Sequence, residues 1–146
     1  MLGGVIMRTK PPPRPVAFLL DAPGAALIGR ILLTFPFWIS GLMKLIGFPS
    51  AVDEATSFGL HPAALVASGV ILLQICGSLA VILNRWTWLG AGALGVFTAM
   101  ANLLAHAFWT FPDPGSRFQA LNAFTANLGL IGGLALAAIL ARGRRP

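Results

Sequence analysis

The sequence predicts an all-α integral membrane protein, a four-helix bundle with both chain termini in the cytoplasm. Of its 146 residues, 57% are hydrophobic and only 10% are charged, whereas a soluble domain has about 25% charged residues. Four apolar runs each contain the roughly 20 residues that a helix needs to cross a hydrocarbon core of about 30 Å. Most basic residues lie outside these runs and on one side of the expected membrane, which identifies that side as cytoplasmic.

The first 24 residues are predicted to form a basic, proline-rich cytoplasmic tail. They contain Arg8, Lys10 and Arg14, and three consecutive prolines occupy positions 11–13. Proline disfavours helical backbone at the residue before it, so we expect this tail to be extended.

The first span is predicted at residues 25–48, and it contains two cations. Arg30 and Lys44 are each expected to cost about 2.5 to 3.5 kcal/mol if they lie within the hydrocarbon core. Each cation either extends its side chain to the nearer membrane surface or has a polar neighbour. Pro36, midway between them, removes a backbone donor and should kink the helix.

The segment at 49–61 contains Asp53 and Glu54 but no basic residue, so it is predicted to be a solvated exterior loop with room for a short surface helix. Trp86 and Trp88, followed by aromatic residues near Phe108, place the two membrane interfaces of the third span. The remaining spans are predicted at 62–83, 87–111 and 119–141, followed by a basic C-terminal tail at 142–146.

Basic residues outside the spans set the predicted orientation. Seven lie on the side of the termini, and Arg117 alone lies on the other side. The seven are three residues in the N-terminal tail, Arg85 in the turn after the second span, and three residues in the C-terminal tail. The excess of Lys and Arg places both termini in the cytoplasm.

Small and hydrogen-bonding residues follow one face of the third span. Neither water nor the hydrophobic effect holds helices together inside a bilayer, so such residues mark a surface that faces another helix. The stripe in the third span follows helical spacing and consists of Gly95, Thr98, Asn102 and His106. A comparable stripe in the fourth span is predicted to face the bundle, with Asn127 pointing elsewhere, and consists of Asn122, Thr125, Gly129 and Gly132 or Gly133.

The expected depths of these residues suggest one polar cluster in the outer half of the bundle. Gln74 lies near the middle of the second span and would form its floor. The candidates for binding a ligand or a quinone are therefore Lys44, Gln74, Asn102, His106 and Asn122. The alternative is that these side chains are structural, with the asparagines and His106 forming interhelical hydrogen bonds. Arg30 is predicted to lie alone in the inner half, where it would contact lipid phosphate or a partner chain.

Several chemistries find no support in the sequence. The single cysteine, Cys76, cannot form an intramolecular disulfide, and the two histidines, His61 and His106, are not spaced as a metal-binding pair. There is no phosphate-binding glycine loop and no nucleophile with a base at suitable spacing. We therefore predict no catalytic residue, no metal, no covalently bound cofactor and no nucleic-acid partner.

The order of several short motifs resembles that of the DoxX family of small four-span membrane proteins. These motifs are Gly29 to Leu32, Ser40 to Leu45, Phe58 to Leu60, the second span with Gly77, His106 to Phe108, and Asn127 to Leu134, and the resemblance covers about residues 25–140. It implies a membrane four-helix bundle with a link to quinone-coupled redox complexes. Where the family typically has a glutamate in the second helix this chain has Gln74, and where it often has a lysine in the fourth helix this chain has Ala126.

The leading functional hypothesis is an accessory, non-catalytic membrane subunit of the inner (cytoplasmic) membrane that packs against a larger complex, a respiratory or other redox assembly. One alternative is a quinone-reactive subunit of a quinone-linked oxidoreductase, in which Lys44, His106 and Gln74 contact the quinone and His106 moves a proton. The other is a lipid-binding membrane protein, in which Arg30 holds an anionic head group.

Overall fold

The computed structural model describes residues 11–142, and regular structure over that range is helical. The elements are α1 (Arg14–Asp21), α2 (Ala25–Ile46), α3 (Phe48–Ser57), α4 (Ala63–Ile82), α5 (Thr87–Ala105), the short 3₁₀ helix η1 (Phe108–Thr110) and α6 (Pro114–Arg142). Four segments in the described range are long and apolar enough to cross a membrane, namely α2, α4, α5 continued through η1, and α6. The predicted all-α class with four spans is confirmed.

The predicted extended tail is wrong for Arg14–Asp21, which form α1. Pro15 lies in the first turn of α1, where its missing N–H would have no helical partner in any case. Side chains such as Phe18 and Leu19 remain exposed in the described chain. The rest of the predicted basic tails, residues 1–10 and 143–146, lies outside the described residues.

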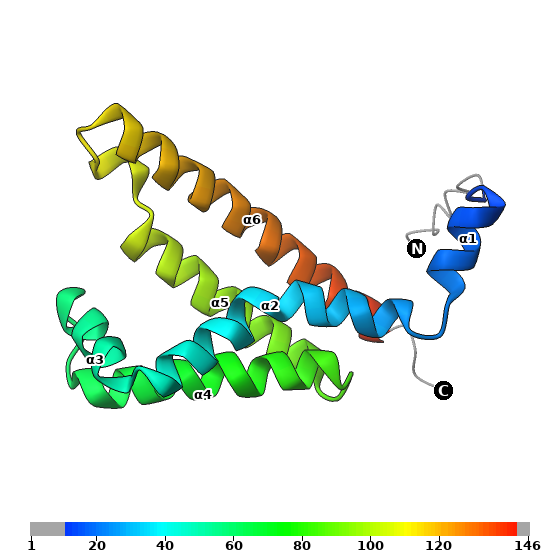
Figure 1. The fold of residues 1–146 in the computed structure, drawn as a ribbon, viewed down its shortest axis with the longest axis horizontal. Coiled ribbons are helices and arrows are strands. Elements are labelled where there is room, and N and C mark those ends of the chain that lie inside the picture. Colours follow the sequence, from blue (N-terminus) through cyan, green and yellow to red (C-terminus); the bar gives the residue numbers. More distant parts are fainter. Residues whose placement is uncertain (1–10, 143–146) are drawn as a thin grey trace, which may run out of the picture.

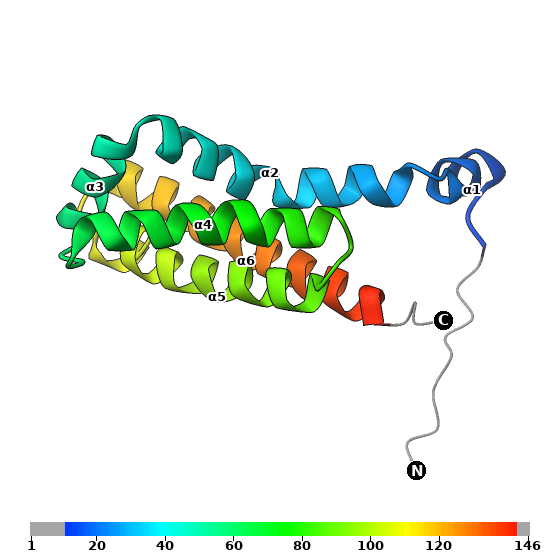
Figure 2. The same ribbon diagram turned by 90° about the horizontal axis from the view of Figure 1, so that it is seen from below.

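Helix α2 bends near its middle, as the proline in its sequence predicts (Figure 2). Pro36 supplies no backbone N–H to the preceding turn. Close by, the Thr34 hydroxyl donates to the carbonyl oxygen of Arg30 at 2.8 Å. Beyond the bend, α2 packs along α4 and buries Phe37 and Gly41.

The predicted exterior loop is mostly helix α3, which lies across one end of the bundle (Figure 1). Ala51 and Ala55 are buried, and α3 packs mainly against α4, while Asp53 faces outward. The chain leaves α3 through Gly59, whose φ of +70° is a conformation that glycine adopts without steric cost.

Helices α4 and α5 approach closely where two glycines meet. A Cβ atom on Gly90 would lie 2.7 Å from the carbonyl oxygen of Gly77 and 2.9 Å from the Cβ of Ala80. Between the helices, Asn84 and Trp86 take left-handed φ angles of 54° and 55°, so the predicted tight turn occurs here. Small residues at the crossing therefore fix how tightly α4 and α5 pack.

The third span, Thr87–Thr110, agrees closely with the predicted 87–111 but is not one continuous helix, and the fourth span begins earlier than predicted. Helix α5 stops at Ala105, and His106 leaves the helix with φ −123° and ψ 30° before η1 begins. Helix α6 starts at Pro114, five residues earlier than expected. The Asp113 carboxylate accepts hydrogen bonds from the Ser116 backbone N–H at 2.8 Å and its hydroxyl at 3.0 Å. These bonds lower the pKa of Asp113 and cap the first turn of α6.

The four long helices form a row in which α2 packs on α4, α4 on α5, and α5 on α6 (Figures 1 and 2). Helices α2 and α6 meet only over a short stretch, where Leu33 packs close to Gly133. The buried apolar cluster joins all four helices and consists of Phe37, Val81, Ala91, Leu94 and Leu134. Buried polar side chains are spread along the bundle, from Thr87 at the α4–α5 turn to Asn102 near the end of α5.

Candidate functional site

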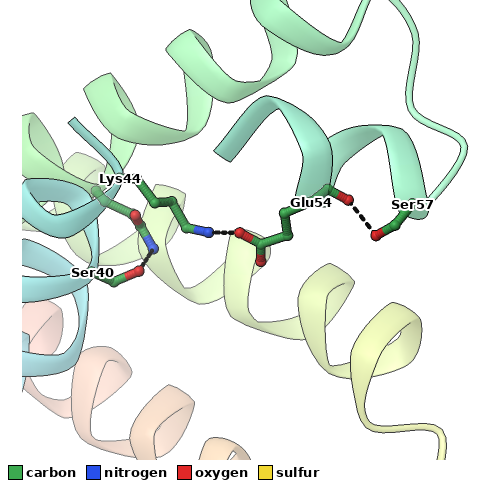
Figure 3. A network of polar contacts seen from close by, with 5 residues as sticks. Ser40, Lys44, Glu54 and Ser57 are labelled. Carbon is green, nitrogen blue, oxygen red and sulfur yellow. Dashed lines mark hydrogen bonds and ion pairs between the residues drawn. The ribbon is translucent and has the colours of Figure 1, made fainter. Parts of the chain in front are cut away.

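Lys44 forms an ion pair with Glu54 of α3 (Figure 3). The Lys44 side chain is 21% exposed and that of Glu54 is 51% exposed. Glu54 is exposed, as predicted for a solvated residue, but α3 turns back over the end of α2 and also brings its carboxylate to the cation. Lys44 thus has a polar protein neighbour, although it is none of the predicted cluster residues.

Gln74 is buried between α2 and α4, with 4% exposure. Its amide nitrogen donates to the Ser40 hydroxyl at 3.3 Å, and its backbone carbonyl accepts a hydrogen bond from Ser78 at 2.6 Å. Its side-chain oxygen has no hydrogen-bond partner. Gly41 lies close to this side chain, since a Cβ added to it would lie 3.2 Å from the Gln74 Cβ. Gln74 therefore helps to hold α2 against α4.

Asn102 and Asn127 join α5 to α6. The Asn102 amide donates to the Phe124 carbonyl oxygen at 3.1 Å and accepts from the Asn127 amide at 3.0 Å. Asn102 is only 2% exposed. Asn127 was predicted to point away from the bundle, and the structure contradicts this.

The error concerns the rotation of α6 about its own axis. Asn122 and Asn127 are five positions apart, which at about 100° per residue places them about 140° apart around the helix. Because Asn127 faces α5 together with Leu134, Asn122 must face outward, and it is exposed. The apolar residues that share the face of Asn127 were the signal for this rotation, and they are Ala120, Phe124, Ile131 and Leu134.

The predicted single cluster is therefore not assembled. Lys44 pairs with α3, Gln74 with Ser40, Asn102 with α6, and Asn122 lies on the outer surface of α6. His106 is half-buried where α5 ends, and its backbone N–H donates to the Asn102 carbonyl oxygen at 3.0 Å. Arg30 is half-buried on the other side of the Pro36 bend from Lys44. Side chains at neighbouring depths do not converge when they lie on helix faces that contact different helices.

A cavity that the sequence did not indicate lies beside the Lys44–Glu54 pair. Its volume is about 290 Å³, and it is lined by residues of α3, α4, α5 and the end of α2. Apart from the ion pair its lining is apolar, with Phe58, Phe97 and Met100 among the larger side chains. Of the five predicted candidates only Lys44 lines it. Within residues 11–142, no three His, Cys, Asp or Glu side chains are grouped so that they could hold a metal ion.

Comparison with known proteins places this arrangement in a family. The DoxX family model matches residues 25–107, from the start of α2 to just beyond α5. The chain belongs to the DoxX family. It is also similar to the inner membrane protein YphA of Escherichia coli (strain K12), with 25% identity over 121 residues, which cover 83% of this chain and 86% of that protein. No solved structure matches the chain significantly.

These findings confirm the predicted resemblance and the predicted location. With four membrane-spanning helices and an inner-membrane relative, this DoxX chain is an integral protein of the inner membrane. The match to the family model includes Lys44, Glu54 and Asn102 but ends before α6, so the Asn127 to Leu134 motif lies outside it. Helix α6, which carries Asn122 on the outer surface of the bundle, thus lies outside the family match.

Proposed function

We propose that the chain is an accessory membrane subunit that packs the outward face of α6 against a helix of a larger membrane complex. The observation that supports this is the chemistry of that face. Positions spaced by alternating steps of three and four residues are exposed there, and they are Asn122, Thr125, Gly129, Gly132 and Leu136. We call this set the α6 seam.

The α6 seam is suited to another helix better than to lipid. A spacing that averages 3.5 residues is the repeat with which helices pack along each other in left-handed pairs. Gly129 and Gly132 have nothing within 4 Å of an added Cβ, so a partner backbone could approach them closely. Hydrocarbon offers no hydrogen bond to the Asn122 amide, whereas a neighbouring helix can. The assignment to a respiratory or other redox assembly comes from the family resemblance.

A pair of leucines on the seam tests this proposal. The Gly129→Leu/Gly132→Leu variant, made in the native membrane and extracted in mild detergent, is expected to migrate on a native gel at the size of the free chain, while the wild type migrates in a larger assembly. Gly29→Leu is the matched control, because Gly29 is exposed on α2 with nothing within 4 Å. If the wild type itself migrated as a monomer, the proposal would be refuted. If it migrated as a dimer of this chain, the partner would be a second copy.

We further propose the orientation with both termini in the cytoplasm. Arg85 and Arg142 lie toward the end of the bundle where α4 meets α5 and α6 stops, and the acidic helix α3 lies at the other end (Figure 2). The arrangement follows the positive-inside rule.

Single cysteines at the two ends test the orientation. With Cys76 replaced by Ala, a cysteine from Asp53→Cys should react with a membrane-impermeant maleimide in spheroplasts. A cysteine from Arg142→Cys should react only after the membrane is permeabilised. The reverse labelling pattern would show that the termini face outward.

The quinone-reactive alternative places Lys44 and His106 around one quinone ring, with Gln74 as an optional third contact. Gln74 is engaged with Ser40, and neither Gln74 nor His106 lines the cavity beside Lys44. The geometry therefore favours the accessory-subunit proposal over a reaction at this cluster. A lipid-phosphate contact of Arg30 remains compatible with the accessory role, since Arg30 lies on the inner side of the bend.

A further inference from the structure

We propose that the α4–α5 side of the bundle binds an uncharged amphiphile, with a compact oxygen-bearing head in the cavity beside Lys44 and a single apolar chain along the adjoining groove. The groove is a second hollow of about 620 Å³ between α4 and α5. It shares with the cavity four lining residues, Val66, Val70, Phe97 and Met100. The two hollows therefore adjoin each other.

The cavity suits an uncharged head. Lys44 and Glu54 neutralise each other at its edge, so an anionic head would meet the repulsion of Glu54 without an unpaired cation to offset it. A Lys ammonium has three donors, and the carboxylate has several acceptor positions. After pairing, the Lys44 ammonium can still donate to a hydroxyl or carbonyl oxygen, and the Glu54 carboxylate can still accept from a hydroxyl. A volume of about 290 Å³ lies at the lower end of the range for small-molecule pockets, roughly 300–1,000 Å³, which fits a head group but no complete lipid.

The groove suits one apolar chain. It runs beside α5 from Met100 to Trp88, a distance of about 18 Å at 1.5 Å per residue, which is more than half of a hydrocarbon core of about 30 Å. Gly69 and Gly92 line it and have nothing within 4 Å of an added Cβ, so they keep it open. The head would lie at the end of the span next to α3 and the tail toward the bilayer interior, which is the direction in which an amphiphile enters from the membrane.

This site is separate from the α6 seam, because α6 packs on the other side of α5 from the groove. Failure of one proposal therefore leaves the other standing. Two sources could supply such a ligand, a prenylated quinone or a monoacylglycerol. They share an uncharged oxygen-bearing head and one chain.

Binding can be measured with the full chain in phosphatidylcholine nanodiscs by native mass spectrometry. The probes are menaquinone-4, 1-monooleoylglycerol and oleate. We expect the wild type to retain one molecule of menaquinone-4 or of monooleoylglycerol, and the adduct mass tells which source is preferred, while oleate is retained at least tenfold less. Retention of neither uncharged probe, or equal retention of oleate, would overturn the proposal.

Two variants separate this site from adventitious lipid. Gly92→Leu fills the groove and should lower retention of the uncharged probe at least tenfold, whereas Gly29→Leu, remote from both hollows, should not change it. Glu54→Gln leaves Lys44 without its anion and should reverse the preference toward oleate. If Gly92→Leu yields no folded protein, the Glu54→Gln result decides, and an unchanged preference there would refute the assignment.

Discussion

The Gly90→Ala variant is expected to have a free energy of unfolding about 1 to 3 kcal/mol lower than that of the wild type. This is the usual cost of overpacking a close contact. Its single added methyl group would lie 2.7 Å from the carbonyl oxygen of Gly77 and 2.9 Å from the Cβ of Ala80. Both obstacles are fixed to the α4 helix, so α4 and α5 must move apart. Replacing glycine by alanine within a helix otherwise stabilises by about 0.5 to 1 kcal/mol, so the clash must exceed that gain.

The midpoint of unfolding in mixed detergent and SDS micelles measures this effect. Gly92→Ala is the matched control, two positions along the same helix, exposed and with nothing within 4 Å of its added Cβ. It should leave the midpoint unchanged or raise it slightly. Equal midpoints for the two variants would mean that the Gly77–Gly90 contact does not limit the packing of α4 against α5.

The sequence predicted the helices better than it predicted their rotation. Apolar length identifies a membrane span regardless of which face is buried, so the four spans and the bend at Pro36 could be predicted. Rotation is harder to predict because lipid-facing and helix-facing surfaces are both apolar. On α6 the polar stripe that includes Asn122 was assigned to the interior, although Asn127 occupies the buried face.

The Lys44–Glu54 pair was missed for a different reason. The acidic residues were placed in a solvated loop, and only the folding of that segment into α3 brings Glu54 to the end of α2. The cavity beside the pair depends on side chains from four helices and has no linear motif. The part of the site that could be predicted is the requirement that Lys44 have a polar neighbour, since a cation within a span is costly without one.

The second large effect is expected at the asparagine pair between α5 and α6. Asn102→Ala removes a bond to the Phe124 carbonyl oxygen and one from the Asn127 amide, at a position that is 2% exposed. Leaving buried polar groups without partners costs about 1 to 3 kcal/mol, although interhelical hydrogen bonds in membranes average nearer 0.6 kcal/mol. We therefore expect Asn102→Ala to lower the free energy of unfolding by about 1 to 3 kcal/mol, measured in the same titration with mixed detergent and SDS micelles.

Asn122→Ala is the control for the asparagine pair, because in the isolated chain Asn122 lies on the exposed face of α6, and it should leave the midpoint unchanged. A double-mutant cycle with Asn127→Ala isolates the side-chain pair from the bond to the carbonyl oxygen of Phe124. If Asn102 and Asn127 act together, the double variant should be less destabilised than the sum of the single variants. Strict additivity, with Asn122→Ala as costly as Asn102→Ala, would instead mean that α6 is rotated to present Asn122 to the bundle.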